Sequence, residues 1–149
     1  MNENPILSLR KISKSFFGVT VLEKIDLDVR SGEVLCLVGE NGAGKSTLCK
    51  IIAGIYDADN GEMFYQGHKY APQSVKQAQE NGIGFIHQEL MLVPQLTVLE
   101  NIFLGAEKAS GCGKMNWALM REKTQHIIDE LELDIKPDDL IADLSIAQQ

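Results

Sequence analysis

The sequence has few cysteines and no long hydrophobic run, and both absences restrict what the protein can be. No stretch approaches the roughly 18 consecutive apolar residues that a membrane-spanning helix needs. The three cysteines, Cys36, Cys49 and Cys112, lack the spacing of a metal site. Cys36 and Cys49 lie in apolar runs, so we expect reduced thiols in the core, whereas Cys112 stands between two glycines and is expected to be exposed.

Positive charge is also scarce. Lysine and arginine total 14 against 21 aspartate and glutamate residues, which gives a formal net charge of −7. A nucleic-acid groove needs a basic surface, so this balance argues against a nucleic-acid partner. The N-terminus lacks the basic and then apolar pattern of a signal peptide, which favours a cytoplasmic location. A chain of 149 residues is long enough for one domain with a sizeable core.

The most informative stretch is residues 39–47, which read Gly-Glu-Asn-Gly-Ala-Gly-Lys-Ser-Thr. They match G-x-x-x-x-G-K-[ST], the phosphate-binding loop or P-loop. Residues 34–38 are continuously apolar and predict a buried parallel strand before the loop, and residues 46–53 predict a helix after it. The glycines let several N–H groups point at one anion, and the helix N-terminus adds partial positive charge. An ordinary glycine-rich turn is the alternative interpretation.

The first half of the chain is predicted to be rich in strands. Alternating apolar and polar residues predict half-buried strands at residues 6–12 and 19–29, with a turn at 16–18 between them. A short strand is expected at residues 62–66. Residues 72–81 predict a polar helix, because a proline stands near the first turn and a glycine follows the end.

The second half is predicted to be mainly helical. It begins with an apolar run at residues 83–87 that predicts another buried strand, followed by a helix near 96–104 and a loop at 109–114. Asn116 is a plausible N-cap for a helix that reaches about residue 133. The apolar residues at helical spacing along that helix are expected to pack in the core: Trp117, Met120, Ile127, Ile128 and Leu131.

Three further segments, in order around the P-loop, resemble the nucleotide-binding subunit of ABC transporters over residues 9–149. Residues 14–16, Lys-Ser-Phe, look like the segment whose aromatic residue stacks on adenine. Residues 84–89, Gly-Phe-Ile-His-Gln-Glu, look like the strand and glutamine of the Q-loop. Residues 144–148, Leu-Ser-Ile-Ala-Gln, look like the signature segment, usually written LSGGQ. Here Ile146 and Ala147 replace its two glycines.

The resemblance implies an α/β fold, a P-loop NTPase core of the RecA-like type with an N-terminal antiparallel β subdomain and the start of an α-helical subdomain. Residues 5–95 would hold the β subdomain and the P-loop and Q-loop core, and residues 96–149 the helical subdomain. The Walker B strand, with its aspartate and the adjacent catalytic glutamate, should lie beyond the signature, as should the switch histidine. No residue of this chain is therefore assigned as catalytic. We expect the 149-residue chain to lack turnover, to bind Mg-ATP weakly or not at all, and to self-associate or rearrange where strand edges are bare.

The sequences of residues 87–90, 93–97 and 100–105 are similar to those of the ATPases of bacterial monosaccharide importers, of the ribose, galactose and arabinose type. Those proteins carry two ATPase domains in one chain and couple ATP binding and hydrolysis to sugar uptake. The implied partners are a second ATPase domain, membrane permease subunits and, indirectly, a periplasmic or extracellular sugar-binding protein. The implied location is the inner face of the cell membrane, bound through the permease. Which sugar is carried should depend on those partners.

The resemblance also implies roles for individual residues, with ATP and Mg²⁺ as cofactors. Phe16 would stack on adenine, with Phe17 as the competing candidate. Alternatively, Phe16 is simply an aromatic residue that packs in the core at the end of a strand. Ser46 and Gln88 would ligate Mg²⁺ or a metal-bound water. Ser145 and Gln148 would face the ATP of a second ATPase domain, and Ser145 could equally cap a helix. The residues expected to hold the phosphates are Gly39, Asn41, Gly42, Ala43, Gly44, Lys45, Ser46 and Thr47.

Three other functions stay open. A soluble DNA-repair ATPase of the ABC superfamily is disfavoured by the acidic composition and by the similarity to sugar importers. Another P-loop NTPase, such as a small kinase or GTPase, is possible, but a GTPase would need the guanine-specifying N-K-x-D, which does not occur. A non-enzymatic regulatory or interaction fragment would keep an ATP-shaped surface without using it. A titration with labelled ATP distinguishes this non-enzymatic fragment from the sugar-import ATPase.

Overall fold

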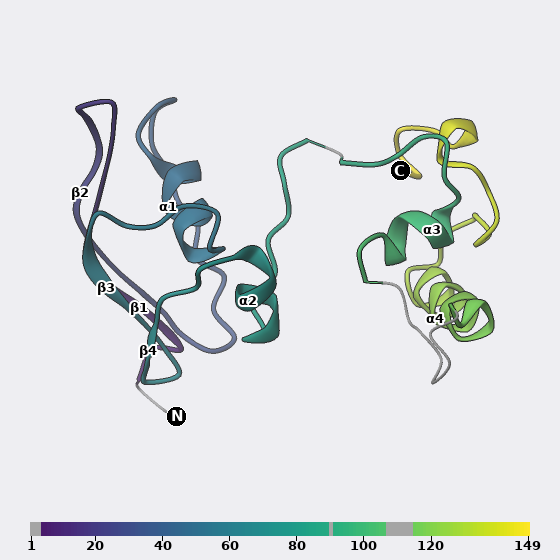
Figure 1. The fold of residues 1–149 in the computed structure, drawn as a ribbon, viewed down its shortest axis with the longest axis horizontal. Coiled ribbons are helices and arrows are strands. Elements are labelled where there is room, and N and C mark those ends of the chain that lie inside the picture. The colour runs from purple at the N-terminus through teal and green to yellow at the C-terminus, as the bar shows by residue number, and fades with distance from the viewer. Residues whose placement is uncertain (1–3, 90, 107–114) are drawn as a thin grey trace. The chain divides into compact units, whose positions relative to one another are not determined.

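The computed structural model describes residues 4–89, 91–106 and 115–149. It consists of two compact units, Met1–Ile86 and His87–Gln149, and each unit has its own hydrophobic core (Figure 1). The predicted loop at 109–114 and Cys112 lie outside the described residues. No helix of the described part is long and apolar enough to cross a membrane.

The first unit is built on an antiparallel sheet in the order β2-β1-β3-β4. Its strands are β1 Leu7–Phe16, β2 Val19–Val29, β3 Asn60–Tyr65 and β4 His68–Tyr70. The alternating pattern predicted β1 and β2, with β2 at the expected bounds and β1 extending further than expected. The short strand expected at 62–66 is β3, which begins and ends slightly earlier. The fourth was not predicted, because three residues are too short for a period of two to show.

One face of this sheet carries the core of the unit. Leu9 and Ile12 of β1 are fully buried, and Ile51 reaches them from α1, Lys45–Ile52. The Tyr70 hydroxyl donates to the carbonyl of Ile52 at 2.8 Å, which fixes the end of α1 to β4. Figure 1 shows α1 beside the strands. A second helix, α2 Val75–Glu80, is shorter than the predicted 72–81 and is capped by the Ser74 hydroxyl.

Two predicted buried strands are absent from this structure. Residues 34–38 and 83–87 have no strand assignment, and Val34 and Val38 are 91% and 92% exposed. A strand needs hydrogen-bonded neighbours, and within the described ranges no strand pairs with either segment. The apolar runs alone could not supply that pairing. Cys36 lies in the first segment and is exposed, which corrects its expected core placement, whereas Cys49 in α1 is half-buried.

The second unit is helical, as predicted, with α3 Val98–Phe103, α4 Trp117–Glu130 and a 3-10 turn, η1 Ile141–Asp143. Both α3 and α4 are shorter than predicted. The turn was not predicted. The buried side chains of the second unit form two clusters, one of Val98, Ile128 and Ile141 and one of Leu99, Phe103 and Met120.

The helix α4 begins at the predicted N-cap, since the Asn116 side chain accepts from the Leu119 N–H at 3.1 Å. Its apolar stripe is only partly a core stripe. Met120 and Ile128 are buried, but Trp117, Ile127 and Leu131 are exposed. The prediction that all five pack in the core is therefore wrong for those three residues, because the described part of the unit packs only one side of the stripe.

Candidate functional site

The predicted P-loop is an exposed loop that leads directly into α1. Gly44 is the N-cap of the helix in a left-handed conformation, with φ 83° and ψ 1°. The first turn of α1 holds no acidic residue, so nothing there opposes an anion at the helix N-terminus. Ser46 is exposed and Thr47 is half-buried in that same turn.

Two glycines of the loop adopt backbone conformations that are unfavourable for residues with a side chain. At Gly44 a Cβ would lie 2.6 Å from Leu22 Cδ2 and 2.8 Å from the Val21 carbonyl oxygen, so β2 leaves no room for one. Gly42 also has a positive φ, 88°, but a Cβ there would meet nothing within 4 Å. The residues present therefore fit a backbone cradle: one glycine brings the helix start against the sheet, and the other lets the loop curl over open space.

The side chain of Lys45 folds back over the loop. Its Nζ donates to the carbonyl oxygens of Gly39 at 2.7 Å and Glu40 at 2.8 Å. The Ala43 N–H also donates to the Glu40 carbonyl, at 3.2 Å, which closes the turn before the helix. The ammonium is thus placed at the loop, held by neutral carbonyls that an anion can outcompete. Asn41 stands exposed within the same turn.

The candidate adenine-stacking residues differ in their surroundings. Phe16 is half-buried at the end of β1, and its ring meets that of Tyr56 edge-on at 5.2 Å between centroids. The Lys14 ammonium lies 5.5 Å from the Phe16 ring centroid and pairs with Asp59 at 2.7 Å. Phe17 is fully exposed at the turn. Phe16 therefore packs against Tyr56 without being one of the buried core residues, and the exposed part of its ring is available for stacking on a base.

The other predicted site residues, Gln88, Ser145 and Gln148, belong to the second unit. Gln88 is exposed at a bend, and the strand expected before it is not formed. Ser145 is exposed and Gln148 half-buried. Among the described residues no group of three or more histidine, cysteine, aspartate or glutamate side chains could hold a metal ion. A magnesium site would instead rely on hydroxyl and amide oxygens together with phosphates, a donor set that suits Mg²⁺.

The signature segment is held by its own side chains. The Ser145 hydroxyl donates to Gln148 Oε1 at 2.7 Å, and the Ser145 N–H donates to the same oxygen at 3.1 Å. The Gln149 amide nitrogen donates to the carbonyls of Ile141 and Leu144. Ser145 donates in both contacts and no helix begins after it in the described residues, so the expected helix-capping role is not seen. The pairing of Ser145 with Gln148 was not predicted, although S-x-x-Q is the spacing of a capping box.

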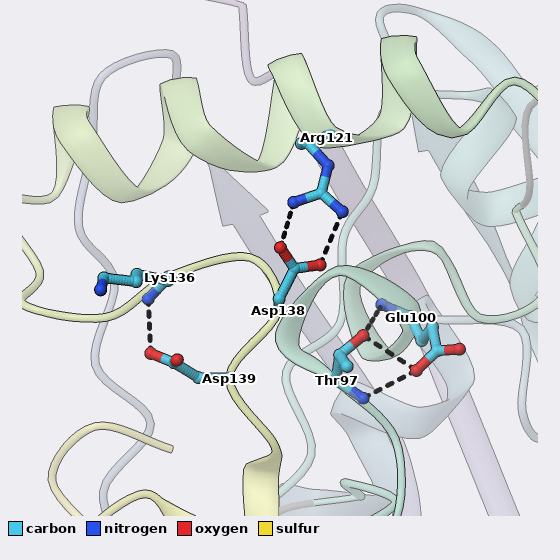
Figure 2. Close-up of polar contacts among 6 residues, drawn as sticks. All are labelled: Thr97, Glu100, Arg121, Lys136, Asp138 and Asp139. Atoms are coloured by element: carbon cyan, nitrogen blue, oxygen red, sulfur yellow. Dashed lines mark hydrogen bonds and ion pairs between the residues drawn. The ribbon is translucent and has the colours of Figure 1, made fainter.

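The segment before the signature is fastened to the helices of the second unit (Figure 2). Arg121 of α4 makes a two-pronged ion pair with Asp138, one prong of which measures 2.6 Å. The Lys136 N–H donates to the Asp139 carboxylate at 2.7 Å. The Arg121 guanidinium lowers the pKa of Asp138 below its ordinary value through this hydrogen bonding. No sequence pattern pointed to this pair, because α4 and the loop bring it together.

The Asp138 pair predicts a specific loss of stability in acid. Because folding lowers the pKa of Asp138, the pair stabilises the fold above the unfolded pKa, about 4, and this is lost as the pH falls through the lower folded pKa. As the pH is lowered from about 5 to about 3, we expect the thermal midpoint of the chain to decrease. The thermal midpoint of the Asp138→Asn variant is expected to decrease less over the same interval. Asp129→Asn is the control, since Asp129 pairs with the neutral amide of Gln125. Parallel pH profiles for wild type and Asp138→Asn would contradict this.

The sequence model of the family described as ABC transporter matches residues 22–149. The chain belongs to the ABC transporter family. The match covers the P-loop and continues through the signature segment, so the order of motifs seen in the sequence agrees with the family. The predicted fold class is confirmed as well, because the solved structures that the chain resembles are ATP-binding cassettes of this family.

Two curated relatives in this ABC family share the name ribose import ATP-binding protein. The one from Caldanaerobacter subterraneus subsp. tengcongensis is 46% identical over 97% of the chain, and the one from Yersinia pestis bv. Antiqua is 46% identical over 100% of it. In both cases the chain spans 29% of the relative's length. The predicted resemblance to the monosaccharide-importer branch is thereby confirmed.

A solved ATP-binding cassette of an ABC transporter shares the fold of the chain. It superposes with a TM-score of 0.82 and 27% identity, over 97% of this chain and 60% of that one. The same cassette in its ADP conformation gives a TM-score of 0.77 and 26% identity over the same shares. The chain thus spans about 60% of the cassette it resembles.

Proposed function

We propose that this chain is the ATP-binding part of a sugar-import ATPase and that residues 39–47 bind the phosphates of Mg-ATP. The observation that carries the proposal is the P-loop itself, where a left-handed Gly44 leaves no room for a side chain and presents the N-terminus of α1 beside the Lys45 ammonium. Membership of the ABC transporter family and the names of the two relatives support it.

Each predicted site residue then has a task. The backbone of Gly39, Asn41, Gly42, Ala43 and Gly44 surrounds the phosphates, and Lys45 exchanges its two carbonyl partners for phosphate oxygens. Thr47 completes the first helical turn. Ser46 and Gln88 would supply oxygen ligands to Mg²⁺, which would neutralise phosphate charge. Phe16 offers its exposed ring edge or face to adenine.

The signature segment with Ser145 and Gln148 would face the nucleotide of a second ATPase domain. ATP binding would then favour the state in which two domains close around two nucleotides. Closure would be passed to permease subunits, which places the protein at the cytoplasmic face of the membrane. A separate sugar-binding protein would deliver the substrate to the permease. The substrate class is a monosaccharide, supported by the two relatives named for ribose import.

Replacing Lys45 tests this proposal. In the chain extended through the rest of the cassette, Lys45→Ala is expected to weaken binding of a fluorescent ATP analogue with Mg²⁺ by about 10- to 100-fold, because a charge-assisted hydrogen bond is lost. It is expected to abolish phosphate release. The 149-residue chain alone is expected to bind weakly and to turn nothing over.

Lys50→Ala is the matched control, since Lys50 lies on the same helix but 5.5 Å from the Tyr56 ring centroid, away from the loop. It should bind like the unmodified protein. Failure of the extended chain to bind Mg-ATP at all would overturn the proposal and favour a non-enzymatic interaction fragment.

A further inference from the structure

Both polar atoms of the Gln148 side-chain amide form hydrogen bonds within the protein. Its Oε1 accepts the two hydrogens of Ser145, from the hydroxyl at 2.7 Å and from the backbone at 3.1 Å. Its Nε2 donates to the carbonyl oxygen of Asp134 at 3.2 Å. A glutamine amide offers two donor hydrogens and one carbonyl oxygen. Little of that capacity is left to recognise a ligand.

A related arrangement, with one further hydrogen bond, occurs at the start of α3 (Figure 2). There the Thr97 hydroxyl and the Thr97 N–H both donate to Glu100 Oε2, each at 2.8 Å, and the Glu100 N–H donates to the Thr97 hydroxyl at 3.3 Å. This is a capping box that fixes the first turn of a helix. Residues 145 and 148 repeat both bonds to the i+3 side-chain oxygen.

The backbone of the signature segment also has the form of a first helical turn. The N–H groups of Gln148 and Gln149 both donate to the Ser145 carbonyl, at 2.9 Å and 3.1 Å. The hydrogen bonds between Ser145 and Gln148 therefore hold this turn together and orient Ser145. Through Asp134, the turn is fastened to the loop that follows α4.

That loop is firmly attached to the rest of the unit. Asp138 pairs with Arg121, and the N–H groups of Ile141 and Ala142 donate to the carbonyls of Leu96 and Pro94. Gln148 thus joins Ser145 to a framework made by α4 and by the segment that precedes α3. A side chain placed in this way sets the orientation of its neighbour.

We propose that Gln148 is a positioning residue that aims Ser145 at the nucleotide, instead of being a nucleotide contact in its own right. The inference rests on the proposed function, in which Ser145 meets the phosphates of an opposing ATP. A serine hydroxyl has one hydrogen, so a phosphate oxygen must replace Gln148 Oε1 as its acceptor. The bond from the Ser145 N–H to Gln148 keeps the residue in place during that exchange.

A double-mutant cycle tests the inference in the chain extended through the rest of the cassette. Ser145→Ala is expected to lower kcat/KM for ATP by about 10²-fold, the usual effect of losing one transition-state donor. If Gln148 acts through Ser145, the variant with both Ser145→Ala and Gln148→Leu stays within about twofold of Ser145→Ala alone. An independent nucleotide contact would instead multiply the two losses, and that result would overturn the inference.

Thr97→Ala is the matched control, because it removes a similar hydroxyl contact to a side chain three residues on, at a helix with no assigned nucleotide role. It should lower the thermal midpoint and leave kcat/KM nearly unchanged. If it lowers kcat/KM as much as Gln148→Leu, loss of stability explains both and the positioning role is wrong. Amide exchange gives a second measurement: Gln148→Leu should speed exchange at Ser145 and leave the Glu100 amide unchanged, and unchanged exchange at Ser145 would overturn the inference. Turnover that is insensitive to Lys45→Ala would overturn the proposed function instead.

Discussion

Replacing Gly44 with alanine is expected to cost the first unit about 2–5 kcal/mol of unfolding free energy and to abolish nucleotide binding. The added Cβ would lie 2.6 Å from Leu22 Cδ2, and its φ of 83° is disfavoured for any residue with a side chain. Strain of the left-handed conformation contributes about 1–2 kcal/mol and overpacking against β2 about 1–3 kcal/mol. Relief of either would move the N-terminus of α1 away from the sheet and open the cradle.

Gly42→Ala separates the two causes. Gly42 has a similar φ of 88°, but a Cβ there meets nothing within 4 Å. The variant should therefore lose only the conformational part, about 1–2 kcal/mol. Urea unfolding of each variant gives the free energies, and titration with a fluorescent ATP analogue in the extended chain gives the binding loss. Equal destabilisation by the two substitutions would show that contact with β2 does not position the P-loop.

The parts of the fold that sequence predicted well are those set by local patterns. The hairpin of β1 and β2 alternates in hydrophobicity around a glycine turn, and Asn116 caps α4 where its side chain indicated. The P-loop follows from fixed residue types within a few positions of one another. In each case the residues that determine the structure are near neighbours in the chain.

Contacts between distant residues could not be predicted in this way. Phe16 meets Tyr56, and Arg121 meets Asp138, only because separate elements bring them together. The apolar run at residues 34–38 shows the converse. Its composition favours a buried strand, but burial and pairing depend on neighbours that no local pattern supplies.

Residues 34–38 are expected to show the largest change in protection of backbone amides from hydrogen exchange. The chain spans about 60% of the cassette it resembles. We predict that in a chain extended through the rest of the cassette, residues 34–38 form the buried parallel strand predicted from the sequence. Their amide hydrogens should then exchange about 10³-fold more slowly than in the 149-residue chain, because strand hydrogen bonds replace contact with water.

The amides of β1 that pair with β2 and β3 serve as the internal control, since they are bonded in the shorter chain already. Hydrogen exchange followed by mass spectrometry on both chains measures the two segments together. Slow exchange confined to the extended chain would mean that the P-loop receives its supporting strand only when distant residues pair with it, which explains why the shorter chain is expected to bind ATP weakly. Equal exchange at residues 34–38 in both chains would show that the loop is held by α1 and β2 alone.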